Sequence, residues 1–543
     1  MHFKTIGKVV LLCLIFNSYL FSSVPKDLSF FDDKPRGLTK DFYIYRYLKK
    51  PTTTSEEAWK LLELTSRMSM KLFHEYAKKL DDPGIKKVSK CLKMKIKPLL
   101  KEDDECLAIK FSIYAATKLN KEELKKVEQR LNNYNISKAL HVIYSENPFD
   151  AMIKGDKNLF FTIYNEVGSK YREKNLDKEI SQKKIKELQG NWRLNQTIKY
   201  TITNNKIKNF NKSLIHIDRF DEVLSHQSLF FLALNALKLR YKKLAMAFLD
   251  ESYKRAYYRM DKDKVLFWQF LISKDTKYKD KIKKSFDLNI YTLLAGVKNK
   301  RIMIAKAWEK NPNYDETDPF GWTNLLNESK GKTPLELEKI ALTYLYGSTL
   351  PHYSYLMEKA SAHKDHYFPI PYKNFLTGIS KKRIALIMAI ARQESRLVPS
   401  AISHSYALGM MQFMPFLAKA IAKEQNIKNF DLDDMFKPKV ALKFANIHLD
   451  WLERSLYHPL FIAYAYNGGI GFTKRLLQSS TFKKGSYEPF LSMELIHYDE
   501  SREYGKKVLA NYITYMWILG EPVSIYDLFK VLTEPSKTDK FRK

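Results

Sequence analysis

Apolar residues recur every three to four positions along most of the chain, which is the spacing of one face of an α-helix. The pattern is clear over residues 56–79, 105–119, 121–132, 137–144, 159–171, 227–240 and 243–259. Short polar breaks separate these stretches, and strand-like alternation is almost absent, with 199–207 as the only weak candidate. The sequence therefore predicts an all-α, mainly helical protein, built as a superhelical array of short helices that bury their apolar faces against their neighbours.

Two segments interrupt this array. Residues 311–319 are polar and contain an Asn-Pro and an Asp-Pro step, and further on Pro369 and Pro371 are separated by a single residue. Paired prolines favour extended backbone, so a domain boundary is expected near residue 365. We predict an α-superhelical domain over residues 24–310, a helical linker domain over 311–364 and a C-terminal domain over 365–543.

The first 23 residues have the pattern of a secretory signal peptide. A basic head with Lys4 and Lys8 precedes an unbroken apolar run over 9–16, and Ser22 and Ser23 follow as small exit residues. The apolar run is too short to span a bilayer comfortably, although an uncleaved N-terminal anchor is the alternative. We expect residues 1–23 to be removed and the mature protein to be exported to the periplasm without a stable membrane span.

The chain has three cysteines, too few for a disulfide framework. After export, Cys91 and Cys106 would lie in an oxidising compartment, where they form either one disulfide or two free thiols. Two lone cysteines are not a metal site, and no His/Cys spacing suggests zinc, so no metal is predicted.

Composition excludes a generically disordered chain, because 45% of the 543 residues are apolar. The net charge of +33 fits a nucleic-acid binder, a protein of anionic surfaces or a lysine-rich genome, and charge alone cannot separate these. Residues 1–360 carry +24 and residues 361–543 carry +9, without a run of five consecutive basic residues. A nucleic-acid partner is therefore not expected.

The candidate chemistry lies after residue 365. Residues 384–391 are all apolar, and Glu394 follows on the helical face of Ile390. A carboxyl group on an apolar face loses hydration, which raises its pKa toward that of a general acid near neutral pH. The alternative is a surface glutamate at a frayed helix end, or one paired with Arg392 or Arg396.

Three later segments offer polar groups beside turns. Gln412 stands among methionines after Gly409 and could bond a sugar hydroxyl or acetamide, although a methionine stripe is more often core. Tyr466 and Asn467 precede a glycine pair that could equally be a helix end. Glu500 begins an apolar helix and could simply cap it.

Taken in order, the segments 369–372, 390–395, 409–415, 465–469 and 500–504 resemble the motifs of the soluble lytic murein transglycosylases, the Slt-type enzymes with a goose-lysozyme-like catalytic domain. The resemblance covers residues 365–525 closely. It implies a superhelical domain before a catalytic domain, and a reaction that cleaves the β-1,4 bond between N-acetylmuramic acid and N-acetylglucosamine. The implied product is a 1,6-anhydromuramoyl end, and the substrate acetamide assists a single acid/base.

The resemblance also implies roles for individual residues. Glu394 takes the place of the catalytic acid/base. The remaining matched positions are expected to bind or orient the substrate, and they are Ser403, Gln412, Met414, Tyr466, Asn467 and Glu500. No metal or cofactor is required. Peptidoglycan glycan strands are the expected partner, with other cell-wall enzymes as further candidates.

Some positions depart from the family pattern. Tyr406 stands where the family often has glycine, and Phe413 replaces an isoleucine, so the groove and its substrate preference could differ. The alternatives to a lytic transglycosylase are a hydrolytic muramidase on the same fold and a non-catalytic peptidoglycan-binding scaffold. With a signal peptide and a muramidase-like site, the basic excess before residue 360 is expected to act as an adhesive, salt-sensitive surface toward the anionic wall, and the alternative is that it only reflects a lysine-rich genome. The sequence leaves open whether the helical array closes into a ring.

Overall fold

The computed structural model describes residues 24–297 and 301–542. These residues form 32 α-helices, six short 3-10 helices and one two-stranded sheet, which confirms the all-α prediction. The predicted signal peptide over 1–23 lies outside the described residues. Among the helices that are described, none is both long enough and apolar enough to cross a membrane.

The first part of the chain is a succession of short helices. They are η1 (Leu28–Phe31), α1 (Leu38–Leu48), α2 (Ser55–Leu64), α3 (Met70–Lys79), α4 (Pro83–Lys93), α5 (Ile96–Leu99), α6 (Asp104–Lys110), α7 (Ile113–Ala116), α8 (Lys121–Arg130), α9 (Ser137–Tyr144), α10 (Pro148–Lys154), α11 (Lys157–Glu166), α12 (Ser169–Asn175), α13 (Gln182–Leu188), α14 (Leu194–Ile202), α15 (Phe210–Ser213), η2 (Leu214–His216), α16 (His226–Lys238), α17 (Lys242–Arg255), α18 (Arg259–Ser273), α19 (Thr276–Lys283) and α20 (Ile290–Leu294).

The second part adds the sheet and longer helices. Its elements are β1 (Arg301–Ile304), α21 (Pro319–Glu328), α22 (Pro334–Leu342), η3 (Gly347–Thr349), α23 (Leu350–Ala360), β2 (His366–Pro369), η4 (Lys373–Leu376), α24 (Lys381–Ser395), α25 (Pro415–Glu424), η5 (Leu432–Phe436), α26 (Pro438–Glu453), α27 (Pro459–Gly468), α28 (Ile470–Gln478), α29 (Phe490–Glu494), α30 (Asp499–Ile518), α31 (Ile525–Lys530), η6 (Val531–Thr533) and α32 (Pro535–Thr538).

Three of the predicted helices are each divided into two. The stretch 56–79 breaks between α2 and α3, because Thr65 is extended and Ser69 caps a new helix through the backbone N–H of Leu72. The carboxylate of Asp41, on α1, accepts the backbone N–H groups of Ser66 and Arg67 at 2.8 and 3.0 Å and so holds the break open. The stretches 105–119 and 159–171 divide in the same way, into α6 with α7 and α11 with α12.

The strand candidate at 199–207 is wrong. Residues 199–202 are the last turn of α14, and residues 203–207 form turns and irregular backbone. The helix α14 buries Leu194, Ile198 and Ile202 at intervals of four residues. That spacing places the three side chains on one helical face, and packing against α11 and α16 outweighs the β-branched residues in the segment.

The two strands lie at the junction between the array and the C-terminal region. The backbone leading into the Pro-x-Pro segment is extended up to Pro369, where β2 ends, whereas Pro371 already lies in the following turn. The strand β2 pairs in parallel with β1 so that Arg301 lies opposite His366. The domain limits at residues 310 and 364 remain predictions.

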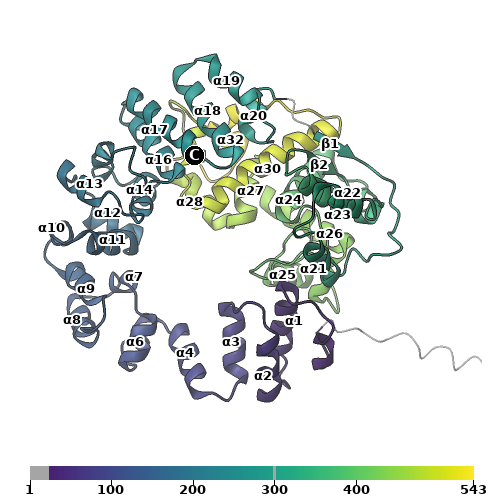
Figure 1. The fold of residues 1–543 in the computed structure, drawn as a ribbon, viewed down its shortest axis with the longest axis horizontal. Helices are drawn as coiled ribbons and strands as arrows, with labels where there is room; N and C mark the ends of the chain where they lie inside the picture. The colour runs from purple at the N-terminus through teal and green to yellow at the C-terminus, as the bar shows by residue number, and fades with distance from the viewer. Residues whose placement is uncertain (1–23, 298–300, 543) are drawn as a thin grey trace, which may run out of the picture.

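The helices follow one another around a ring (Figure 1). The ring is closed where α1 lies beside α21 and, through Arg46, contacts the region of η5 in the C-terminal part of the chain. There the Arg46 guanidinium pairs with Asp433 at 2.6 Å and Asp431 at 2.9 Å, and the Tyr43 hydroxyl donates to Asp433 at 2.9 Å. A second contact joins Lys199 of α14 to Asp499 of α30. The N-terminal array therefore touches the C-terminal region from two directions.

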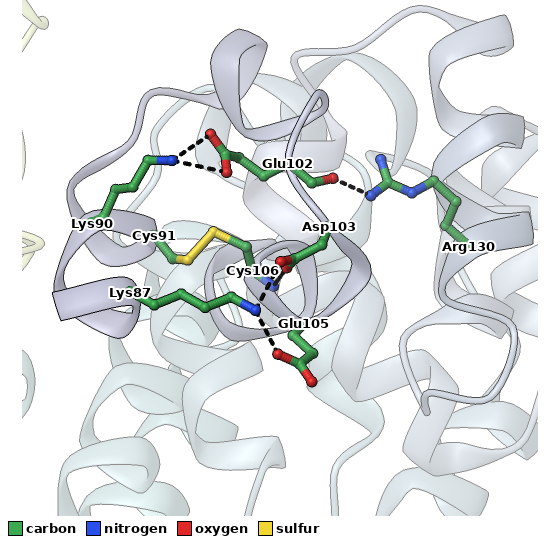
Figure 2. The surroundings of a disulfide bond; sticks show 8 residues. All are labelled: Lys87, Lys90, Cys91, Glu102, Asp103, Glu105, Cys106 and Arg130. Atoms are coloured by element: carbon green, nitrogen blue, oxygen red, sulfur yellow. Dashed lines mark hydrogen bonds and ion pairs between the residues drawn. A yellow bond between two sulfur atoms is a disulfide. The ribbon is translucent and has the colours of Figure 1, made fainter. Parts of the chain in front are cut away.

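A disulfide joins Cys91 of α4 to Cys106 of α6 (Figure 2), which decides between the two states that the sequence left open. The Cα atoms are 5.3 Å apart and the residues are 15 positions apart in sequence. Lys87 pairs with Asp103 at 2.8 Å beside the bridge. The bond ties two neighbouring short helices of the array, which on their own have little apolar surface to hold them together.

Candidate active site

Glu394 lies at the end of α24, the helix whose apolar centre was evident in the sequence. Residues 384–391 are buried, and α24 packs along α30. The helix stops directly after Glu394 and Ser395, because Arg396 and Leu397 adopt left-handed backbone angles with φ of 58° and 69°. Glu394 is thereby held at the rim of the core, partly buried but still reachable from solvent.

Burial raises the pKa of Glu394 to about 7. The hydroxyl of Tyr504 donates to Glu394 Oε1 at 2.7 Å, which favours the charged carboxylate and limits the rise. The negative charge of Glu500 acts in the opposite direction and adds to it. At neutral pH the protonated and charged forms of this carboxyl group are therefore both populated. A group with such a pKa can donate a proton and later accept one.

The two arginines beside Glu394 are engaged elsewhere. Arg392 donates to the Tyr367 carbonyl at 3.0 Å and pairs with Glu358, and Arg396 pairs with the same Glu358 at 3.2 Å. Glu358 belongs to α23, so these pairs join α24 to a helix that precedes β2. The alternative of a Glu394 neutralised by Arg392 or Arg396 is thus wrong.

A compact loop over residues 401–413 lies beside Glu394; we call it the active-site loop. Leu408 pairs with Phe413 through two backbone hydrogen bonds, at 2.9 and 3.0 Å. Gly409, with φ of 75°, has no room for a side chain, since a Cβ there would lie 2.1 Å from the Met435 carbonyl oxygen. The loop is joined to the end of α24 by Ser395, whose hydroxyl donates to the Met410 carbonyl at 2.8 Å.

Gln412 and Ser403 stabilise the active-site loop itself. The Gln412 side-chain nitrogen donates to the carbonyls of Gly409 and Ala401, at 2.9 and 3.1 Å. The Ser403 hydroxyl accepts the Ala407 N–H at 2.9 Å within its own turn. Both predicted residues therefore have structural bonds, and the Gln412 nitrogen is already satisfied without a sugar. Partly exposed Met414 follows as the N-cap of α25, at the edge of the loop.

Tyr466 and Asn467 lie at the end of α27 and link the loop to α30. The Tyr466 hydroxyl donates to the Met411 carbonyl at 2.8 Å. Burial raises the pKa of Tyr466, and the charge of Glu394 adds to the rise. Asn467 donates to Glu500 Oε1 at 2.9 Å and accepts from the Ser501 hydroxyl at 2.6 Å. Glu500 is exposed in the first turn of α30 and so presents its carboxylate beside the site.

Tyr504 is a further candidate site residue, which the sequence analysis did not single out. It lies four residues after Glu500, hence on the same face of α30, and is almost fully buried. The adjacent Gly505 lets α27 approach, because a Cβ there would lie 2.1 Å from the Tyr464 ring. The available signal was the matched segment 500–504, which ends on Tyr504, but the partner of Tyr504 is 110 residues away in the sequence.

The structure thus gathers Glu394, Tyr504 and Glu500 with Tyr466 and Asn467, while Ser403, Gln412 and Met414 belong to the adjoining loop. Within the described part of the chain, no group of three or more His, Cys, Asp or Glu side chains could hold a metal ion. The arrangement offers one sheltered carboxyl group, a phenol that bonds it, and a second carboxylate in a more polar setting.

Comparison with known proteins finds relatives of the region that contains these residues. Residues 377–488 match the family model of the transglycosylase SLT domain. The soluble lytic murein transglycosylase of Escherichia coli strain K12 is 29% identical over 215 residues, and that of Salmonella typhimurium is 26% identical over 214 residues. Each alignment covers 38% of this chain and 33% of the relative, so the match spans about a third of the length of these curated relatives.

Solved structures of similar proteins include the 70 kDa soluble lytic transglycosylase of Escherichia coli, with a TM-score of 0.48 at 16% identity over 93% of this chain and 86% of that one. The lytic transglycosylase Slt of Pseudomonas aeruginosa gives 0.47 at 15% identity over 89% and 79%. The sequence matches confirm the resemblance recognised in the motifs: the C-terminal region of this chain contains a transglycosylase SLT domain, similar to that of the soluble lytic murein transglycosylases.

Proposed function

We propose that this protein is a peptidoglycan lytic transglycosylase that cleaves the β-1,4 bond between N-acetylmuramic acid and N-acetylglucosamine and leaves a 1,6-anhydromuramoyl end. The observation that supports this most strongly is the single sheltered carboxyl group of Glu394, with a pKa of about 7 and a hydrogen bond from Tyr504. The SLT-domain match over the same residues supports the substrate class.

In the first step, protonated Glu394 donates its proton to the glycosidic oxygen as the bond to C1 of the muramic acid breaks. The substrate's own acetamide oxygen stabilises the positive charge at C1, so no protein nucleophile is needed. Charge develops on the Glu394 carboxylate during this step, and the Tyr504 hydroxyl at 2.7 Å stabilises it.

In the second step, the Glu394 carboxylate takes the proton of the muramoyl C6 hydroxyl, and that oxygen attacks C1. The nucleophile is already attached to the sugar, which gives it a high effective concentration and makes water unnecessary. Because Glu394 returns to its protonated form, one residue serves as acid and then as base. A pKa near neutrality suits both tasks.

The groove residues have supporting roles in this proposal. Glu500 and Asn467 bind substrate at the polar side of the site, while Tyr466 and Met414 contact the sugar rings. Ser403 and Gln412 act by holding the active-site loop in shape. The enzyme works in the periplasm on glycan strands, whose stem-peptide carboxylates are attracted to the basic excess of the helical array.

Digestion of purified peptidoglycan sacculi tests the proposal. The wild-type protein should solubilise sacculi, and Glu394→Gln should lose activity by a thousandfold or more, because the amide cannot donate a proton. Glu503→Gln, on the same helix as Tyr504 but turned toward Lys506 and Arg502, serves as a control for loss of a carboxylate. Equal activity of Glu394→Gln and wild type would leave the scaffold alternative standing.

A further inference from the structure

Tyr406 joins the active-site loop to the N-terminal helix α1. Its backbone is left-handed, with φ of 60°, a conformation that a side chain disfavours. Its ring is only 2% exposed and lies 5.1 Å from the Tyr45 ring and 5.6 Å from the Phe42 ring, measured between centroids. The unfavourable backbone conformation is therefore held by packing against residues that lie more than 350 positions earlier in the chain.

The turn that carries Tyr406 is bonded rigidly to the rest of the active-site loop. The Tyr406 N–H donates to the Ser403 carbonyl at 2.8 Å, and the Ser403 N–H donates to the Ala407 carbonyl at 3.0 Å. Leu408 then pairs with Phe413, and between them Met410 accepts the Ser395 hydroxyl. Because Ser395 directly follows Glu394, a shift of Tyr406 would reach the end of the catalytic helix through a short chain of bonds.

The N-terminal helices hold this region at further points. The Lys71 ammonium of α3 donates to the Ser405 carbonyl at 3.0 Å, next to Tyr406. Arg46 of α1 pairs with Asp431 and Asp433 at η5, the element whose Met435 carbonyl lies against Gly409. The N-terminal helices α1 and α3, which close the ring, thus contact the active-site loop directly at Ser405 and indirectly through η5.

We propose that closure of the ring positions the active-site loop, and that Tyr406 is the positioning residue through which α1 and α3 act on Glu394. The N-terminal array is then part of the catalytic apparatus as well as a surface that binds the wall. This inference rests on the proposed function, because it concerns the same site. It predicts a loss of turnover when Tyr406 loses its ring contacts, even where the fold is retained.

The test uses the full chain with Tyr406→Gly and Tyr406→Phe. Glycine accepts a φ of 60° without strain, so the turn can form while the ring contacts are removed. We expect kcat on soluble glycan strands to fall about tenfold or more with KM changed less than about twofold, since misplaced catalytic groups cost rate more than binding. Tyr406→Phe keeps both ring contacts and loses the long bond from the hydroxyl to the Asp41 carbonyl at 3.4 Å, so it should keep kcat within about twofold of wild type. An unchanged kcat in Tyr406→Gly would overturn the proposal.

A matched control is Tyr487→Gly. Tyr487 is also a tyrosine with a left-handed backbone, with φ of 67°, and its ring packs against Trp268 of the helical array at 6.1 Å. Both variants lose a contact between the array and the C-terminal region, and urea unfolding shows how much stability each loses. Tyr487→Gly should keep kcat within about twofold of wild type. A loss of kcat of about tenfold in both variants would show that the Tyr406 contacts only stabilise the fold, and it would overturn the proposal.

Tyr45→Ala supplies a double-mutant cycle. If α1 acts through Tyr406, Tyr45→Ala should lower kcat in the wild-type background and have no further effect on Tyr406→Gly. Additive effects would contradict the proposal. Hydrogen exchange provides a readout that does not depend on the reaction: amides over 407–413 should exchange faster in Tyr406→Gly than in Tyr487→Gly, and equal exchange would also contradict it.

Wild type and Glu394→Gln in the same assay distinguish failure of the proposed function from failure of the inference about Tyr406. If wild type releases no anhydromuramoyl product, the proposed function fails whatever Tyr406 does. If wild type is active and Glu394→Gln is not, the function stands, and the Tyr406→Gly result decides the inference alone.

Discussion

Replacing Tyr504 with phenylalanine removes the hydroxyl that donates to Glu394 at 2.7 Å and leaves the ring in place. A hydrogen bond to a charged group contributes about 1.5–3 kcal/mol, and part of it persists when the carboxyl is protonated. We take the difference between the two protonation states as about 1–1.5 kcal/mol, which corresponds to roughly one pKa unit. The pKa of Glu394 should therefore rise from about 7 toward roughly 8.

The sign of the expected change in activity follows from the role of Glu394 as acid. Activity falls as pH rises through its pKa, because the deprotonated form cannot protonate the glycosidic oxygen. In Tyr504→Phe this fall should come about one pH unit later than in wild type, while the maximal rate decreases because the developing carboxylate loses its donor. Initial rates of sacculus solubilisation across the pH range measure both effects.

Tyr515→Phe is the matched control for this experiment. Tyr515 lies on the same helix, is fully buried and donates its hydroxyl to the Pro369 carbonyl at 3.1 Å, away from Glu394. Its loss should cost about 1 kcal/mol of stability and leave the pH profile unchanged. A Tyr504→Phe profile that coincides with wild type, or that moves to lower pH, would refute the assignment of Tyr504 as the residue that tunes Glu394.

Three further predictions concern stability. The pKa of Glu394 is raised from 4.5 to about 7, so wild type loses stability as pH rises through this interval. Glu394→Gln should therefore be more stable than wild type by about 3 kcal/mol near pH 8 and not near pH 4, and a gain independent of pH would contradict the shift. Replacing Cys91 and Cys106 by alanine should cost about 3 kcal/mol in urea unfolding, and insensitivity of wild type to a reductant would argue against the disulfide. Glu358→Gln leaves Arg392 buried without its carboxylate and should cost about 3 kcal/mol, whereas a cost below about 1 kcal/mol would show that the pair contributes little.

Local features of the sequence predicted much of the fold. Helices are encoded in the spacing of apolar residues over one or two turns, which is why α24 and the placement of Glu394 on its buried face could be predicted. The breaks within 56–79 were missed because a side chain from another helix, Asp41, holds the backbone of Ser66 and Arg67. Such a tertiary contact does not change the spacing of apolar residues in the segment that it breaks, so the sequence pattern does not reveal it.

The site was predicted in the same uneven way. Glu394 could be predicted because its desolvation follows from apolar neighbours on its own helix. Tyr504 was not, since its bond to Glu394 depends on how α30 packs against α24, which lies more than 100 residues earlier in the chain. Gln412 was assigned to the sugar from its residue type, whereas its left-handed backbone turns its nitrogen toward loop carbonyls.

The central claim is that Glu394 directs the muramoyl C6 hydroxyl, and not water, to C1. Digestion of sacculi by the full chain in heavy-oxygen water, followed by mass spectrometry of the released muropeptides, tests it directly. The account predicts products lighter by one water molecule than reducing muropeptides, with no heavy oxygen incorporated and with their release abolished in Glu394→Gln. Reducing ends that carry heavy oxygen would show that water is the nucleophile and that the protein is a hydrolase.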